Sequence, residues 1–207
     1  MAHVLVLSAH PRTDQSVLNR AMLAAARAIN RVELVDIYAE YPDFDIDIDR
    51  EQQRLLEADI LVLQHPVYWY SCPALLKEWL DLVFEHGFAY GSEATALAGK
   101  TVIQVTTCST AREAFTKKGK YQNELRTLFS PFEQTMKFCD MVYLAPYGIF
   151  SAEDAADEKR LDSIIADYHR ALTALVEGTL DIEKAISAPL LNDVLGQVIN
   201  SPELAAD

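Results

Sequence analysis

The chain has 207 residues, half of them hydrophobic, with 18 basic and 31 acidic residues that give a formal net charge of −13. This length predicts a single domain with one substantial core. The negative charge argues against nonspecific binding to nucleic acid or to an anionic membrane surface, because the field of the whole protein repels both. No apolar run is long enough to cross a bilayer.

The chain has three cysteines, an odd number, and they are widely spaced at Cys72, Cys108 and Cys139. This usage predicts neither a disulfide framework nor a zinc site, and it fits a reducing compartment. Residues 1–4 lack the basic segment that precedes the apolar core of a secretory signal. We therefore expect a cytoplasmic protein.

Runs of apolar and β-branched residues alternate with segments whose apolar residues recur at helical spacing. In chain order, the sequence predicts a strand at 3–8, a helix at 17–30, a strand at 32–37, a helix at 50–58, a strand at 59–64, a helix at 73–85, a strand at 100–107, a helix at 125–138, a strand at 140–145 and a helix at 153–176. Ser16 is a suitable N-cap for the first helix, and Pro73 suits the first turn of the third. This alternation predicts an α/β fold with a doubly wound, five-stranded parallel sheet of the flavodoxin-like kind.

We expect residues 1–178 to form this single domain. Beyond Gly178 the pattern weakens, and the tail 179–207 is expected to hold a short amphipathic helix around 190–199. Two alternatives stay open for this tail, namely disorder and wrapping around a partner subunit.

Aspartates alternate along the segment 43–49, which superficially suggests a calcium loop. Such a loop needs glycine at its sixth position, where Ile48 or Arg50 would fall, and a closing glutamate that is absent. The histidines also lack metal-ligand spacing. The sequence therefore predicts no metal site, and we interpret 43–49 as an exposed acidic connection.

Two adjacent aromatic residues, Tyr68 and Trp69, follow the strand predicted at 59–64. In open α/β sheets, ligands bind at the carboxyl ends of the strands. Large aromatic side chains there present a flat apolar face to a flat ligand. The alternative is that both side chains simply cover the core, which is the usual role of an aromatic pair.

The loop after the first predicted strand leads into a helix N-terminus, where free N–H groups and the helix dipole favour an anion such as phosphate. His10, Arg12, Ser16 and Asn19 supply further donors. The loop has no glycine, so it is neither a Walker loop nor a dinucleotide fingerprint. The alternative is that Ser16 is a simple helix cap and His10 a simple loop residue.

A third loop, 106–110, follows the strand predicted at 100–107 and is rich in hydroxyl groups. Its donors suit the polar rim of a ring stacked against Trp69. Because these loops meet at one edge of the sheet, they predict a ligand with a phosphate at one end and a planar heterocycle at the other. Flavin mononucleotide fits this description.

Several motifs together carry a resemblance to a known family. They are His10-Pro11, Ser16, Asn19, 64–70 (QHPVYWY), 86–91 (HGFAYG) and 105–107 (VTT). Over residues 4–176 the chain resembles the NAD(P)H:quinone oxidoreductases of the flavodoxin-like fold. Within that family it is most similar to the small ancillary flavoproteins of bacterial glutathione-gated potassium-efflux systems, which the segment 41–48 also resembles.

The resemblance implies where a flavin would bind. Its phosphate end would meet the loop and first helical turn that contain His10, Ser16, Val17 and Leu18. Its isoalloxazine would be lined by Pro66, Val67, Tyr68 and Trp69, and its polar edge would be reached by Thr106, Thr107, Cys108 and Ser109.

The resemblance also implies an enzyme, an NAD(P)H dehydrogenase (quinone) that uses FMN; FAD stays an alternative, and the choice between NADH and NADPH stays open. The nicotinamide and the quinone would occupy the same place over the ring, which predicts ping-pong kinetics without a side-chain nucleophile. Family members are homodimers with substrate sites between subunits, and Tyr90 lies in a motif that often faces that interface.

The sequence departs from the family pattern in two places. Cys108 and Ser109 stand where family members commonly have two glycines, so a side chain there is expected to crowd the cofactor or alter its potential. Tyr121 matches a tyrosine that helps stabilise the reduced ring, but no histidine follows it until His169. Backbone dipoles, or the basic side chains at Lys117, Lys118 and Arg112, would then carry that role.

Two other functions remain as alternatives to the reductase. The first is a regulatory subunit that docks on a membrane potassium-efflux transporter, which would bring the protein to the inner face of the membrane. The second is a flavodoxin-like electron carrier with stable one-electron forms and little NAD(P)H turnover.

Overall fold

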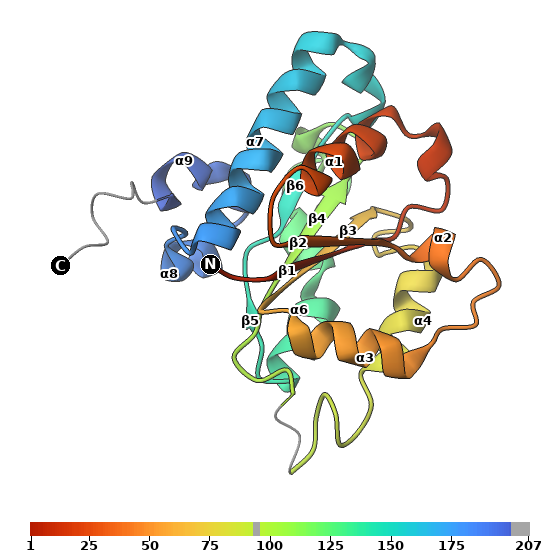
Figure 1. Ribbon diagram of the computed structural model, residues 1–207. Coiled ribbons are helices and arrows are strands. Elements are labelled where there is room, and N and C mark those ends of the chain that lie inside the picture. Colours follow the sequence, from red (N-terminus) through yellow and green to blue (C-terminus); the bar gives the residue numbers. More distant parts are fainter. Residues whose placement is uncertain (93–95, 200–207) are drawn as a thin grey trace.

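A parallel sheet in the strand order β2-β1-β3-β4-β5 forms the centre of the computed structural model, which describes residues 1–92 and 96–199 (Figure 1). A sixth short strand, β6, also pairs with β4. The strands are β1 (Val4–Ser8), β2 (Val32–Asp36), β3 (Ile60–Pro66), β4 (Thr101–Thr107), β5 (Val142–Tyr143) and β6 (Tyr147–Ile149). The sheet confirms the predicted doubly wound, flavodoxin-like fold in a single domain.

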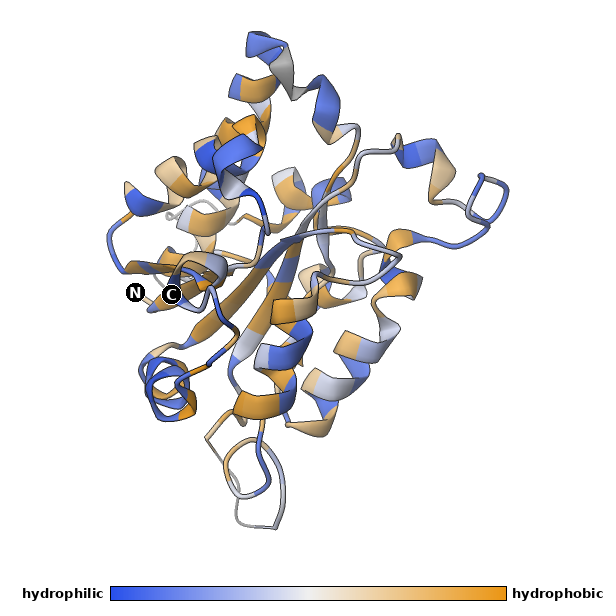
Figure 2. Ribbon diagram, turned by 90° about the vertical axis from the view of Figure 1, so that its right-hand side faces the viewer, coloured by the Kyte–Doolittle hydropathy of each residue, from blue (hydrophilic) through white to orange (hydrophobic). Residues whose placement is uncertain are grey.

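The central strands are covered on both faces. Every residue of β1 and β3 is buried, which explains why both read as continuous apolar runs instead of alternating ones. In Figure 2, orange hydrophobic segments run along the strands and along the helix sides that face them. Burial of these side chains is the main force that holds the helices against the sheet.

Helices pack on both sides of the sheet. The longer ones are α1 (Val17–Arg27), α3 (Ile48–Glu57), α4 (Ala74–Val83), α6 (Ser130–Phe138) and α7 (Glu158–Glu177). The shorter helices and 3₁₀ turns are η1 (Thr13–Gln15), α2 (Ile37–Glu40), η2 (Arg112–Ala114), α5 (Leu125–Leu128), η3 (Ala152–Ala156), α8 (Ile182–Ser187), η4 (Leu191–Asp193) and α9 (Leu195–Val198). One core cluster joins the sheet to α1 and α7, and a second joins it to α3, α4 and α6. No helix among the described residues is long and apolar enough to span a membrane.

The fifth strand position differs from the single strand predicted at 140–145. It is divided into β5 and β6, and Leu144, Ala145 and Pro146 lie between them. The Ala145 N–H donates to the carbonyl of Ala185 in the C-terminal segment, 2.9 Å away, instead of continuing the ladder. Pro146 has no N–H to donate. The strand is therefore interrupted where the Ala145 N–H donates to the C-terminal segment and not to a neighbouring strand.

The helix predicted at 125–138 is also divided, into α5 and α6, with Phe129 at the junction. Pro131 lies in the first turn of α6, where proline is tolerated because the first N–H groups of a helix have no intrahelical partner. In the interior of one continuous helix the same proline would remove a hydrogen bond, so a new helix begins here. Similarly, the helix predicted from 153 begins at Glu158, because Asp157 caps it by accepting from Arg160 N.

The C-terminal segment 179–199 packs on the domain itself. Its apolar side chains Ala185, Leu191, Leu195 and Val198 are buried in the core cluster that contains α1 and α7. Asp181 N donates to the Val198 carbonyl at 2.7 Å, which closes α8 and α9 into a compact unit beside α7 (Figure 1). The helix expected around 190–199 is thus η4 followed by α9. Residues 200–207 lie outside the described residues, and a role of the tail toward a partner stays a prediction.

Candidate functional site

The turn after β3 is backbone-strained and carries an exposed tryptophan. Tyr68 and Ser71 exchange two backbone hydrogen bonds of 3.2 and 2.9 Å, which leaves Trp69 and Tyr70 as the two central residues. Both have positive φ, +48° and +64°, a conformation that usually calls for Asn or Gly and costs roughly 1–2 kcal/mol for a bulky residue. Trp69 is 93% exposed, so burial of its own side chain does not offset this strain. Such strain is characteristic of functional turns.

A cavity of about 180 Å³ lies beside this turn, between the carboxyl ends of β3 and β4. The residues that line it are Val67, Trp69, Tyr70, Cys108, Ser109, Thr110, Phe115 and Tyr121. The two strand ends are joined by the Val67 N–H, which donates to the Thr107 carbonyl at 2.8 Å. The cavity therefore occupies the edge of the sheet at which open α/β proteins bind ligands.

Tyr121 forms the far wall of this cavity. Its hydroxyl makes a 2.9 Å hydrogen bond with the Thr110 hydroxyl. Its ring packs against Phe115, with centroids 4.9 Å apart, and edge-on against Tyr70 at 5.4 Å. These contacts join the 109–121 loop to the strained turn, so Tyr121 is held in place over the cavity with its polar end hydrogen-bonded.

Cys108 brings a buried thiol to the cavity. Its N–H donates to the Ile149 carbonyl and its carbonyl accepts from Ala152 N, both at 2.8 Å, so its backbone is already committed within the protein. Burial raises the pKa of the Cys108 thiol to about 12. A thiol is nucleophilic as the thiolate, so Cys108 acts as a neutral wall and not as a nucleophile.

The loop after β1 presents the N-terminus of α1. Ser16 caps this helix, because its Oγ accepts from Asn19 N at 3.2 Å and from Asn19 Nδ2 at 3.0 Å. Since both of these bonds use the oxygen, the hydroxyl hydrogen of Ser16 is available to donate to a ligand. The Leu18 side chain is buried in the core, so only the backbone N–H of this residue can bind an anion. The Val17 side chain is exposed.

His10 and Arg12 lie earlier in the same loop. The Arg12 N–H donates to His10 Nδ1 at 3.1 Å, so the neutral ring carries its hydrogen on Nε2, where it can donate. Burial lowers the pKa of His10, which favours this neutral form, although Asp36 opposes the shift. The Arg12 guanidinium pairs with Asp14 at 3.2 Å on the surface. Its role as a phosphate donor stays a prediction.

The structure divides the predicted site residues into groups. Val67, Trp69, Cys108, Ser109 and Tyr121 come together around the cavity, whereas His10, Arg12, Ser16, Val17 and Leu18 lie on the separate loop and helix terminus. Four others do not line the cavity: Pro66 and Thr106 are buried in their strands, Thr107 contributes its carbonyl to Val67, and Tyr68 is partly exposed beside the turn.

Phe115 is a lining residue that the sequence reasoning missed, and no local pattern marks it. Thr110 belongs to the loop 106–110 whose donors were expected to face the polar rim of the ring, and Tyr70 stands in the motif 64–70 without an assigned role. These residues come close to Tyr121 because of the path of the 109–121 loop. That path is determined by η2 and by hydrogen bonds such as the one that Tyr121 N–H donates to the Ala114 carbonyl at 3.0 Å.

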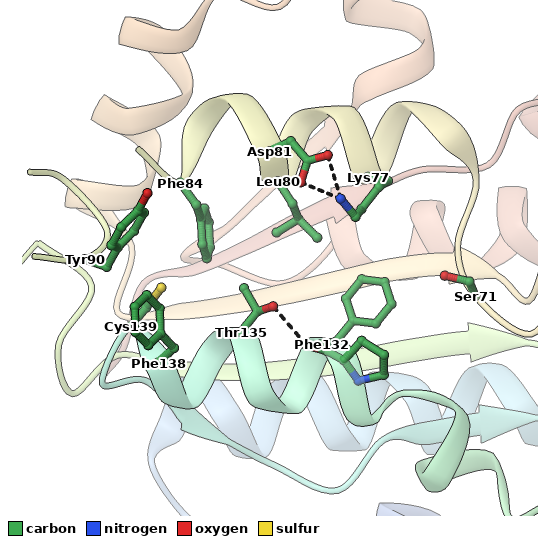
Figure 3. Close-up of a pocket in the computed structure, with 11 residues that line it drawn as sticks. Ser71, Lys77, Leu80, Asp81, Phe84, Tyr90, Phe132, Thr135, Phe138 and Cys139 are labelled. Atoms are coloured by element: carbon green, nitrogen blue, oxygen red, sulfur yellow. Dashed lines mark hydrogen bonds and ion pairs between the residues drawn. The ribbon is translucent and has the colours of Figure 1, made fainter. Parts of the chain in front are cut away.

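A larger groove of about 340 Å³ lies between α4 and α6 (Figure 3). Ser71, from the strained turn, stands at one end, and Tyr90 stands at the other. Phe138, on α6, is 65% exposed at this groove and contacts the Tyr90 ring with centroids 5.3 Å apart. On the α4 side, Lys77 and Asp81 form an ion pair at the rim. The groove is thus a partly apolar surface that adjoins the candidate site.

The comparisons with known proteins agree with this fold. The model of a family described by its flavodoxin-like fold matches residues 2–172. The chain is 46% identical, over 149 residues (72% of this chain and 81% of the relative), to the glutathione-regulated potassium-efflux system ancillary protein KefG of Serratia proteamaculans. It is similar to general stress protein 14 of Treponema denticola, solved in complex with FMN, with 33% identity and a TM-score of 0.79 over 83% of this chain and 98% of the other.

A second solved structure, an NADPH-quinone reductase from P. pentosaceus, is 27% identical, with a TM-score of 0.73 over 82% of this chain and 96% of the other. The coverage of both solved structures is nearly complete, so the likeness extends over the whole sheet and its helices. The chain therefore belongs to the flavodoxin-like fold family, among relatives that include the KefG ancillary proteins and NADPH-quinone reductases.

Proposed function

We propose that this protein is a flavin-dependent NAD(P)H:quinone oxidoreductase that binds FMN. The observation that carries the proposal is the aromatic-walled cavity at the carboxyl ends of β3 and β4, beside a turn strained to present Trp69. The N-terminus of α1, where free N–H groups favour an anion, follows the carboxyl end of β1, the strand next to β3 in the same parallel sheet. A ligand with a ring and a phosphate meets both features.

The polar groups of the site fit such a ligand. Among the described residues, the buried side-chain oxygens that have no hydrogen-bond partner are Ser8 Oγ and Thr106 Oγ1. Ser8 is the last residue of β1, directly before the loop to α1, and Thr106 is near the end of β4, before the cavity residues. Buried polar atoms are normally paired. Neither atom is reached by solvent, so a ligand does not contact them directly, and the fit rests on the more accessible donors: the first-turn N–H groups of α1, Ser16 and Ser109.

The residues present account for the separate parts of the cofactor. The N–H groups of the first turn of α1, with Ser16 and the Nε2–H of His10, would hold the phosphate. Val67 and Trp69 would contact the ring, and Ser109 and Thr110 would donate to its polar edge. When bound, a flavin supplies reversible two-electron hydride exchange, and the protein orients and tunes it. Tyr121 and the neutral Cys108 exclude water and contribute no nucleophile.

The proposed mechanism is ping-pong, with one place over the ring for both substrates. Because the nicotinamide and the quinone would both need the exposed side of the ring beside Trp69, the donor is expected to leave before the acceptor binds. FMN is preferred over FAD because a neighbour of 33% identity was solved with FMN.

We also propose that the protein acts as a homodimer. Tyr68, Trp69 and Tyr70 are 43%, 93% and 48% exposed, an aromatic cluster that a monomer would leave in water. The groove between α4 and α6 continues from Ser71 of the same turn to Tyr90. A second copy on this face would cover both. Sedimentation of wild type and of Phe138→Lys tests this, since a monomeric wild type contradicts it.

A second function is favoured by the names of the relatives. Proteins that are 46% identical are ancillary proteins of a glutathione-regulated potassium-efflux system. We propose that this chain likewise binds a potassium-efflux transporter and so works as a peripheral protein at the membrane. Co-purification with the transporter in mild detergent tests this role independently of catalysis, and its absence there would contradict it.

The first experiment is the visible absorption spectrum of the purified protein before and after anaerobic addition of NADH or NADPH. A flavin band that bleaches and then returns with a quinone supports the reductase, and chromatography after acid release distinguishes FMN from FAD. A stable semiquinone with little turnover would instead indicate an electron carrier. A colourless protein that does not bind added FMN or FAD would contradict the proposed function.

A further inference from the structure

Two chains of hydrogen-bonded polar side chains run through the interior of the domain, one on each face of the sheet. Gln64 on β3 and Gln104 on β4 are completely buried, and each accepts a hydrogen bond from a buried tyrosine. Polar groups are costly to bury unless they are fully paired. In these positions aliphatic side chains would fill the core at less cost. The direction of each series of hydrogen bonds indicates why polar side chains occupy these positions.

The first chain of bonds, which we call the Tyr168 relay, ends at the N-terminus of α1. The Tyr168 hydroxyl, from α7, donates to Gln64 Oε1 at 2.7 Å. Gln64 Nε2 donates to Asn19 Oδ1 at 3.3 Å, and Asn19 Nδ2 donates to Ser16 Oγ at 3.0 Å. Every donor in the relay points toward Ser16.

This uniform direction has a consequence for Ser16. Its oxygen receives two donors from Asn19, the side-chain Nδ2 and the backbone N–H. The hydroxyl hydrogen must then point away from the protein interior, toward whatever occupies the helix terminus. Hydrogen bonds arranged in series polarise one another. The relay therefore makes Ser16 an oriented donor to an anion.

The second chain of bonds, the Tyr143 relay, ends beside the ring side of the site. The Tyr143 hydroxyl donates to Gln104 Oε1 at 2.5 Å, and Gln104 Nε2 lies 2.9 Å from His65 Nε2. Since the amide nitrogen can only donate, His65 Nε2 accepts and the ring hydrogen is on Nδ1. Nδ1 then donates to the Pro66 carbonyl at 3.0 Å. Pro66 directly precedes Val67, which lines the cavity.

We propose that the two relays position the two ends of the flavin site separately, Tyr168 acting on the phosphate end through Ser16 and Tyr143 acting on the ring end through Pro66. Tyr168 and Tyr143 are thus positioning residues. They are buried on opposite faces of the sheet, in different core clusters, so neither relay passes through the other. This inference rests on the proposed function, because it takes FMN as the ligand.

The test compares two matched variants, Tyr168→Phe and Tyr143→Phe, with two ligands, FMN and riboflavin. Each variant removes one buried hydroxyl that donates to a glutamine, so both should lose similar stability. Riboflavin has the ring but no phosphate. Dissociation constants are measured by quenching of flavin fluorescence, and thermal unfolding of each variant verifies that it is folded.

Tyr168→Phe should weaken FMN binding by on the order of 3- to 10-fold, the effect of one misdirected hydrogen bond, and leave riboflavin binding within about twofold of wild type. Tyr143→Phe should weaken both ligands by the same factor, because both contain the ring. In a Ser16→Ala background, Tyr168→Phe should cause no further loss for FMN, since the end of its relay is gone.

Equal effects of Tyr168→Phe on the two ligands would overturn the inference, and so would an unchanged affinity for FMN. An additive loss in the Ser16→Ala background would also overturn it, because Tyr168 would then act by another route. If the wild-type protein binds neither FMN nor riboflavin, the proposed function itself is wrong and this inference falls with it. Binding of FMN and riboflavin to the wild-type protein therefore distinguishes failure of the proposed function from failure of this inference.

Discussion

Arg112, in the loop that forms the wall of the candidate site, makes an ion pair with Asp193 in the C-terminal segment, with 2.6 Å between Nη2 and Oδ1. Near this pair, the Asn192 amide both donates to and accepts from the backbone of Gly148, at 3.0 and 2.8 Å. The family model ends at residue 172. The segment beyond the family match is therefore attached to the loop that carries Tyr121.

This attachment predicts that Asp193→Asn loosens the 109–121 loop. The Arg112 side chain is half exposed, so the pair contributes at most about 1 kcal/mol and global stability should change little. Trypsin should cleave faster after Lys117, Lys118 and Lys120, and affinity for FMN should fall. Mass spectrometry of the digest locates the cuts.

Asp167→Asn is the matched control, because Asp167 pairs with Arg170 at 3.1 Å on α7, in another part of the chain. Its digestion pattern should equal that of the wild type. If both variants are cleaved at the same rate in the loop, Asp193 does not restrain it.

The strained turn predicts opposite effects on stability and binding. In the free subunit, Trp69→Asn should raise the free energy of unfolding by about 1 kcal/mol, since Asn adopts positive φ more easily and the indole, which no second copy covers there, loses little burial. Flavin binding and quinone reduction should fall, because the aromatic face is removed. Urea unfolding and a steady-state assay measure the two effects.

Phe44 provides the control, because it is also exposed, has a φ of +63° and lies away from the cavity. Phe44→Asn relieves a similar strain but loses the contact of its ring with Tyr38, so it should stabilise the protein less than Trp69→Asn and leave activity unchanged. Loss of stability in Trp69→Asn would show that the indole contributes packing that outweighs the strain.

His65 predicts a loss of stability in weak acid. Burial lowers the pKa of His65 from the ordinary value of 6.5 to about 4. Above pH 6.5 the ring is neutral in both states, so it makes no pH-dependent contribution. Between pH 6.5 and 4 the unfolded chain takes up a proton that the folded chain excludes, which lowers the free energy of unfolding by up to about 1.4 kcal/mol per pH unit and roughly 3 kcal/mol in all.

Urea unfolding at pH 7, 6 and 5 measures this dependence. His65→Gln should be less stable than wild type at pH 7 but should lose less stability between pH 6.5 and 5. His169→Gln, at an exposed position on α7, serves as the control for removing a histidine. Parallel pH profiles for wild type and His65→Gln would contradict the assignment.

The buried thiols predict low reactivity. Burial raises the pKa of Cys108 to about 12 and that of Cys72 to about 11. At pH 8 the thiolate fraction of Cys108 is on the order of 10⁻⁴, so iodoacetamide should modify it roughly a thousandfold more slowly in the native protein than in urea. Peptide mass spectrometry follows each cysteine. Rapid native alkylation of Cys108 would mean that the thiol is accessible and activated.

The sequence alone determined the layers of the fold and the edge at which the site lies. Apolar runs and helical spacing are local properties, and five strands that alternate with helices leave few arrangements other than a doubly wound parallel sheet. Such a sheet brings the loops after β1, β3 and β4 to one edge. For this reason His10, Ser16, Trp69 and Cys108 were recognisable as candidates from the order of strands and loops alone.

The tertiary structure decided the features that depend on residues far apart in the chain. The bond from Tyr168 to Gln64 joins residues 104 positions apart, and the Arg112–Asp193 pair joins residues 81 apart. The division of the fifth strand has the same origin, since Ala145 donates to Ala185. Local periodicity carries no information about such partners, because they are selected by the packing of whole elements. The place of Phe115 in the cavity wall was therefore visible only in the folded chain, whereas Tyr121 was already a candidate from the family resemblance.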